Sequence, residues 1–157
     1  MDLDQTAQQV FVKMMSLQDE KAVIIVTSKY LRNLLAYITK NQSLNEIIVP
    51  ASMGVESQML NDLTMQLTDL YKQRTERALY STDKNPALKA LDLQINATKN
   101  ALSENVRSAI NTNVITLQEI DSRINYLQSK ISELPENQRV LIGIQRKYKL
   151  VDAIYTF

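Results

Sequence analysis

The stretch between Pro86 and Pro135 constrains the fold of this 157-residue chain more than any other feature. It contains no glycine and no proline, the residues that most often interrupt helices, and Asn85 precedes it at the position of a helix N-cap. Proline is favoured at the first helical position and disfavours helix in the residue before it, so the two prolines mark the two ends. The pattern predicts one continuous helix over about 86–134, roughly 70 Å long at about 1.5 Å per residue.

Apolar residues recur in steps of three and four along this stretch, which is the heptad pattern of a coiled coil. Successive steps of four from Thr98 to Ile110 relax the left-handed supercoil locally. Asn113 occupies a seam position, where it is either a polar residue at a solvated edge or a buried asparagine that fixes register. The predicted seam consists of Leu88, Leu91, Ile95, Thr98, Leu102, Val106, Ile110, Asn113, Leu117, Ile120, Ile124, Leu127, Ile131 and Leu134.

The segment before this helix predicts two others, over about 4–41 and 55–80. The first includes a β-branched run at 23–27 that favours strand by propensity, but a seven-residue apolar repeat on both sides keeps it helical. Residues 42–54 form a break, with 47–49 extended ahead of Pro50 and Gly54 at its end. The repeat of the first helix is Leu3, Val10, Leu17, Ile24, Leu31 and Ile38, and that of the second is Leu60, Leu63, Leu67, Leu70 and Arg74.

The short polar connector 81–85 joins the second helix to the long one, so Asp83, Asn85 and Pro86 form a predicted hairpin tip. The second helix reaches only about half of the long helix. Part of the seam must therefore be covered by the first helix, which we favour, or by another subunit. That part is Leu117, Ile120, Ile124 and Leu127.

A fourth helix is predicted over 136–157, with an apolar stripe that includes Leu141, Ile144 and Tyr148. The sequence ends at Phe157 inside this stripe, which predicts that the natural chain continues. Together these patterns predict an all-α fold in a single domain, 1–157. Its expected form is an elongated antiparallel helical hairpin or coiled-coil bundle with one very long helix.

The residue types present argue against catalysis by this chain. It has no histidine and no cysteine, so the commonest acid–base group, the thiolate nucleophile and the usual zinc ligands are missing. Asp62, Asp69, Glu119 and Asp121 are expected to be solvated flanks of the seams. We expect no catalytic residue, no metal and no cofactor.

The charge and the hydropathy limit the partners of the chain. A net charge of +1 gives no electrostatic case for binding nucleic acid. Met1 is followed by Asp2 and Asp4 instead of a basic and then apolar run, so no signal peptide is predicted. No apolar run approaches the length of a membrane span, so any membrane contact is expected through segments outside this sequence.

Motifs near both ends of the long helix resemble those of a known family. At its start they are Asn85 and Pro86 of the hairpin tip, and after its end they are Leu134, Pro135, Glu136, Arg139, Arg146, Tyr155 and Phe157. With these residues the chain is similar to the end of the periplasmic coiled-coil region in bacterial polysaccharide co-polymerases, the Wzz-type chain-length determinants and Wzc-type exopolysaccharide tyrosine autokinases. Gln138 and Ile154 replace the Glu and Leu that the family often has at these places.

The resemblance implies a periplasmic segment of a bacterial inner-membrane protein that self-associates and sets the length of an exported polysaccharide. A polysaccharide polymerase or an outer-membrane export channel would be its partner, and any kinase domain would lie elsewhere in the parent chain. Three other readings remain open. They are a periplasmic hairpin adaptor of an efflux or secretion system, a generic structural coiled coil, and an enzyme with a site inside a helical bundle.

Overall fold

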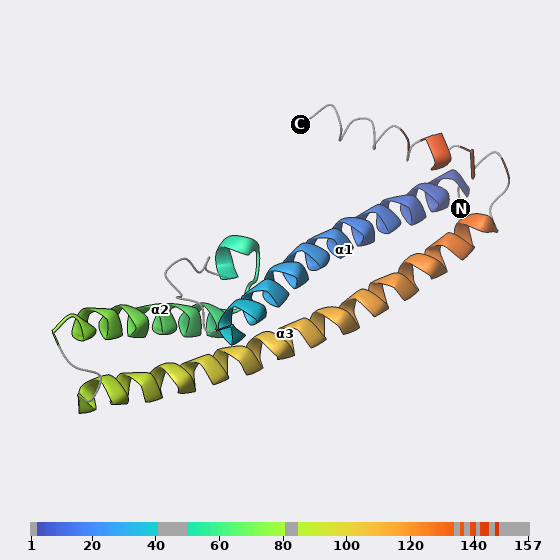
Figure 1. Ribbon diagram of the computed structural model, residues 1–157. Helices are drawn as coiled ribbons and strands as arrows, with labels where there is room; N and C mark the ends of the chain where they lie inside the picture. Colours follow the sequence, from blue (N-terminus) through green and yellow to red (C-terminus); the bar gives the residue numbers. More distant parts are fainter. Residues whose placement is uncertain are drawn as a thin grey trace. The chain divides into compact units, whose positions relative to one another are not determined.

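A computed structural model describes residues 3–40, 50–80, 85–133, 136, 139, 140, 142–144 and 147. Three long helices account for most of them: α1 (Leu3–Thr39), α2 (Gln58–Ala78) and α3 (Pro86–Ser132), with a short 3₁₀ helix, η1 (Pro50–Met53), between α1 and α2 (Figure 1). No strand occurs among these residues, so the predicted all-helical class is confirmed. The β-branched run at 23–27 lies inside α1.

The chain divides into two compact units. Unit 1 comprises Met1–Ala22 with Thr116–Phe157, and unit 2 comprises Val23–Ile115. Both α1 and α3 therefore contribute residues to each unit.

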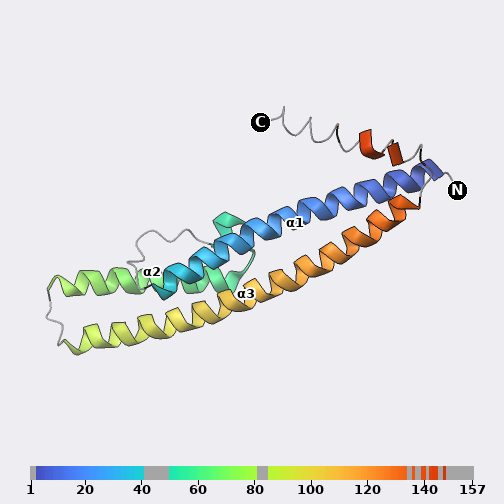
Figure 2. The same cartoon turned by 45° about the vertical axis from the view of Figure 1, so that its right-hand side comes forward.

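Unit 2 contains α2, the start of α3 and the end of α1 around one apolar core. Figures 1 and 2 both show α2 beside the first part of α3, running in the opposite direction. Arg74 Nε and Asp92 Oδ1, 2.5 Å apart, link these two helices at the surface. Except for Leu34, these core residues of unit 2 come from the predicted seams: Leu31, Leu34, Ile38, Leu60, Leu67, Leu70, Leu91, Ile95, Leu102 and Val106.

Unit 1 buries apolar residues of α1 and of the second half of α3. Both views show these parts of the two helices side by side (Figures 1 and 2). Lys21 Nζ on α1 lies 2.5 Å from Asp121 Oδ1 on α3, which ties the two helices together across 100 residues of sequence. The buried apolar side chains of these two helices in unit 1 are Phe11, Met14 and Leu17 on α1 and Ile120, Ile124 and Leu127 on α3.

The last predicted stripe needs a correction. Ile144, placed on the buried face by the heptad count, is 56% exposed, while Ile142 is only 6% exposed. Residues two positions apart point to opposite sides of a helix, so within 142–144 the buried side chain lies opposite the one that the heptad count predicted. Leu141 and Tyr148, the neighbouring members of the predicted stripe, lie outside the described residues.

Local capping chemistry sets the start of α2. Ser57 has an extended backbone, and its Oγ accepts a hydrogen bond from the Leu60 amide at 3.4 Å, which is N-cap geometry. The helix therefore begins at Gln58, three residues later than the sequence pattern suggests. Ahead of it, Gly54 adopts a φ of 74°, a left-handed conformation that suits glycine and turns the chain from η1 into the cap.

Candidate functional site

The hairpin tip predicted from the sequence is resolved on its α3 side. Asn85 Oδ1 accepts a hydrogen bond from the Ala87 amide at 2.9 Å, and the Asn85 carbonyl accepts from Leu88 and Lys89. Pro86 is the first helical residue, where its missing N–H costs nothing. Asp83 lies outside the described residues, so the tip is known structurally only through Asn85 and Pro86.

Of the seven family-like residues that follow α3 in the sequence, the structure describes two. Glu136 and Arg139 are helical and exposed. The remaining five, Leu134, Pro135, Arg146, Tyr155 and Phe157, lie outside the described residues. The structure thus brings no two of these residues into a described contact.

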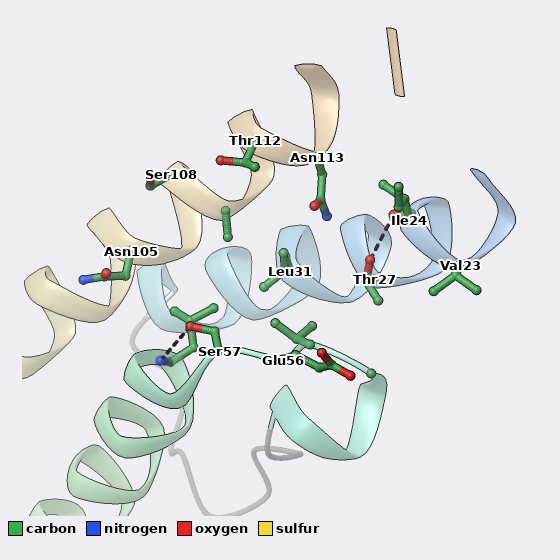
Figure 3. Close-up of a pocket in the computed structure, with 14 residues that line it drawn as sticks. Val23, Ile24, Thr27, Leu31, Glu56, Ser57, Asn105, Ser108, Thr112 and Asn113 are labelled. Carbon is green, nitrogen blue, oxygen red and sulfur yellow. Dashed lines mark hydrogen bonds between the residues drawn. The ribbon is translucent and has the colours of Figure 1, made fainter. Parts of the chain in front are cut away.

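A pocket of about 450 Å³ lies within unit 2 and is a candidate site (Figure 3). Its walls come from α1, from the segment Gly54–Ser57 and the first turn of α2, and from α3. Its volume is within the range of small-molecule sites in proteins. The apolar part of the lining is Val23, Ile24, Leu31, Val55, Leu60 and Ala109, and the polar part is Thr27, Glu56, Ser57, Asn105, Ser108, Thr112 and Asn113.

Hydrogen bonds fix several of the polar lining groups. Asn113 Nδ2 donates to Ser28 Oγ at 2.9 Å, which links α3 to α1. Ser28 is only 4% exposed, so this bond satisfies a hydroxyl that would be costly to bury alone. Asn113 is half-buried and bonded to a residue of the facing helix. This agrees with the second alternative from the sequence, an asparagine in the seam that fixes the register of the two helices.

Two further side chains are held by their own helices. Thr27, 8% exposed, donates from Oγ1 to the Ile24 carbonyl at 3.1 Å (Figure 3). Asn105 Nδ2 donates to the Ala101 carbonyl at 2.8 Å. The carboxamide oxygens of Asn105 and Asn113 and the Ser108 hydroxyl have no hydrogen-bond partner among the described residues. The pocket therefore offers a hydrogen-bonding surface that is largely uncharged, with Glu56 as the one ionisable group in its lining.

The sequence pattern did not predict this pocket. Its lining residues come from three segments up to 90 positions apart, and their meeting depends on tertiary packing. The signal that could have pointed to it is the spacing of Asn105, Ser108 and Thr112. Steps of three and four place these polar residues along one flank of α3, directly beside the apolar seam.

The expected flanking carboxylates are at the surface or paired there. Asp62 accepts from Gln58 one turn earlier, Glu119 pairs with Arg123, and Asp121 pairs with Lys21. In the described segments, no three carboxylates come close enough to one another to hold a metal ion.

Burial perturbs two tyrosines beside the core of unit 2. Loss of solvent raises the pKa of Tyr30 from 10.0 to about 12. Burial also raises the pKa of Tyr71, a change that Arg74 opposes and Asp92 reinforces. Neither tyrosine lines the pocket, so their titration reports on packing.

Three comparisons with known proteins complete the description of the site. No protein-family model, curated protein or solved structure matches the chain. Among the helices described here, none combines the length and the apolar character that crossing a membrane requires.

Proposed function

We propose that the chain is the periplasmic scaffold segment of a bacterial inner-membrane protein that regulates the length and export of a capsular, exo- or O-antigen polysaccharide. In this proposal α2 and α3 form an antiparallel helical hairpin within a coiled-coil bundle. The segment has no chemistry of its own, self-associates in the parent protein, and works beside a polymerase or an outer-membrane channel. A kinase domain, where the parent has one, lies elsewhere.

The observation that carries the proposal is the extent of α3. This helix starts at Pro86 behind the Asn85 cap, and it ends at Ser132, two residues before the Leu134–Pro135 pair. The Asn85–Pro86 and Leu134–Pro135 motifs, through which the chain resembles the polysaccharide co-polymerases, thus flank one helix in the sequence. The buried seam of that helix supports a scaffold role, since a long helix is stable only with partners along its length.

Deletion of the gene in its own bacterium tests the proposal. We expect the length distribution of a surface polysaccharide, separated on a gel, to change, and the full-length gene to restore it. Leu102, fully buried in the core of unit 2, gives a variant, Leu102→Asp, that should fail to restore it. The exposed neighbour Glu104 gives the control, Glu104→Gln, that should restore it. An unchanged polysaccharide in the deletion strain would refute the proposal.

A second candidate is a periplasmic hairpin adaptor of an efflux or secretion system. The capped start of α3 beside the end of α2 favours it, because such adaptors also present a helical hairpin. In that case the deletion strain should become sensitive to exported compounds while its polysaccharide stays unchanged.

A further inference from the structure

We propose that the pocket of unit 2 binds a neutral, hydroxyl-rich ligand with the chemistry of a sugar unit. The inference adds a ligand to the proposed function. It rests on that function only for the source of the sugar, which would be a growing or exported polysaccharide. The binding itself is argued from the lining of the pocket.

The unused hydrogen-bonding capacity of the lining points to a ligand with hydroxyl groups. Asn105 and Asn113 each make one described bond, through Nδ2, and each keeps a carboxamide oxygen that can accept. Ser108 keeps a hydroxyl that can donate and accept. A sugar hydroxyl donates and accepts at one atom, so adjacent hydroxyls can satisfy groups of both kinds.

The charge of the lining selects against ionic ligands. None of the fourteen residues that line the pocket is lysine or arginine, so an anion would lose its hydration without a compensating charge. Glu56 is exposed, which lets water screen its carboxylate. A neutral ligand has the smallest desolvation cost in such a site.

The apolar lining suits the other face of the same ligand. Ile24 and Ala109, both half-buried, form part of the wall in front of the buried side chains of Leu31 and Leu60. A sugar ring carries C–H groups between its hydroxyls, and these can pack on aliphatic side chains while the hydroxyls reach the polar residues. The mixture of polar and apolar wall therefore fits a sugar better than a hydrocarbon.

The walls are held before any ligand arrives. Asn113 is oriented by its bond to Ser28 on α1 (Figure 3 shows Asn113 projecting from α3 toward α1). Thr27 is bonded to its own helix through the Ile24 carbonyl. Such preorganisation lowers the entropy that binding must overcome.

Amide chemical shifts of the isotope-labelled chain test the inference directly. Titration with glucose, galactose and N-acetylglucosamine should give saturable shifts centred on Thr27, Asn105, Ser108 and Asn113 for at least one sugar. Glucuronate, an anionic relative of glucose, should bind more weakly. A parallel titration with dextran, a glucose polymer, distinguishes the two sources of the sugar. Shifts with dextran indicate a sugar unit within a polymer, and shifts with monosaccharides alone indicate a free sugar.

Matched variants separate the pocket from nonspecific effects. Ser108→Leu places a larger side chain in the pocket and breaks no described hydrogen bond, and Asn105→Ala removes one carboxamide. Each should weaken binding about tenfold, the equivalent of one or two hydrogen bonds. Ser122→Leu and Asn100→Ala, exposed positions of α3 outside the pocket, should bind like the wild type.

The inference and the proposed function can fail separately. If no sugar of the panel gives saturable shifts, or if Ser108→Leu binds as well as the wild type, the pocket is not a sugar site, whatever the deletion strain shows. If the sugar binds and the deletion strain keeps its polysaccharide unchanged, the site stands and the proposed function falls.

Discussion

At the scale of single residues, a few polar side chains define where helices start and how they pair. Asn85 caps α3 through its side chain and its carbonyl, and Ser57 does the same for α2 through Oγ. Asn113 and Ser28 pair between α3 and α1. Each of these groups satisfies a donor or an acceptor that the fold would otherwise leave unpaired.

The cap of α3 leads to a first prediction. Asn85→Ala should lower the free energy of unfolding by about 1 kcal/mol, because the Ala87 amide loses its acceptor. Urea denaturation followed by circular dichroism measures the change. Asn100→Ala, in the exposed interior of the same helix, serves as the control and should change stability by less. Equal losses in both variants would show that the cap contributes nothing.

The pair between Asn113 and Ser28 leads to a second prediction. A double-mutant cycle with Ser28→Ala and Asn113→Ala should give a coupling energy of about 1 kcal/mol, typical of a net hydrogen bond. Additive losses, with no coupling, would mean that the hydrogen bond between the two side chains contributes nothing to stability.

The buried tyrosine leads to a third prediction, on alkaline stability. The pKa of Tyr30 is about 12 in the folded chain against an ordinary value of 10.0, so the folded state holds the phenol proton more tightly. Stability from this group is complete below pH 10 and is lost as the pH rises from about 10 to about 12. Tyr30→Phe should reduce that loss. Tyr80→Phe, at a residue 90% exposed, should leave it unchanged. Urea midpoints across this pH range provide the measurement.

At the scale of elements, the residues that directly follow α2 are highly exposed. Leu79 and Tyr80, which follow α2, are 73% and 90% exposed, so they contribute little to the core of unit 2. The contacts that hold α2 to α3 lie further from the connector. They are made at Leu67 and Leu70 and at the Arg74–Asp92 pair.

An insertion at the connector gives the fourth prediction. Two glycines added after Asp83 should cost less than about 1 kcal/mol, because loop-closure entropy grows slowly with length. Thermal melting of the insertion variant beside the wild type measures this. A loss of several kcal/mol would show that the connector is packed against the helices.

At the scale of the whole molecule, the question is whether the chain buries its own seam. Ile120, Ile124 and Leu127, beyond the part of α3 that lies beside α2, are 2%, 7% and 9% exposed within the single chain. Both views show the first part of α1 beside this region of α3, and Lys21 bonds to Asp121 there. The structure thus agrees with cover of this seam by the first helix.

The fifth prediction follows from that cover. Leu127→Ala should lower the free energy of unfolding by about 2–3 kcal/mol. This is the low end of the range for a buried leucine, because Leu127 keeps 9% of its surface exposed. The melting temperatures of wild type and variant should not depend on protein concentration. Leu93→Ala, a leucine of the same helix that is 72% exposed, should have a small effect. Melting that rises steeply with concentration, together with a monomeric variant in sedimentation, would place the contact between subunits.

The sequence by itself determined the three long helices and the apolar seams that α2 and α3 bury. The Asn85–Pro86 start, the absence of glycine and proline after it, and steps of three and four are local signals, because a helix is built from contacts between near neighbours. Leu67 and Leu102, both on predicted seams, have no exposed surface in the structure. The seam pattern says which face of a helix packs, and it leaves open which partner covers that face.

Only the tertiary structure decided which residues meet across the chain. Lys21 and Asp121 pair over 100 positions, and the pocket joins α1, the loop before α2 and α3. Such contacts depend on how helices are placed, and a repeat of seven residues carries no information on that. The same reason explains Ile142 and Ile144, where the heptad count predicted burial of Ile144 and packing buried Ile142 instead.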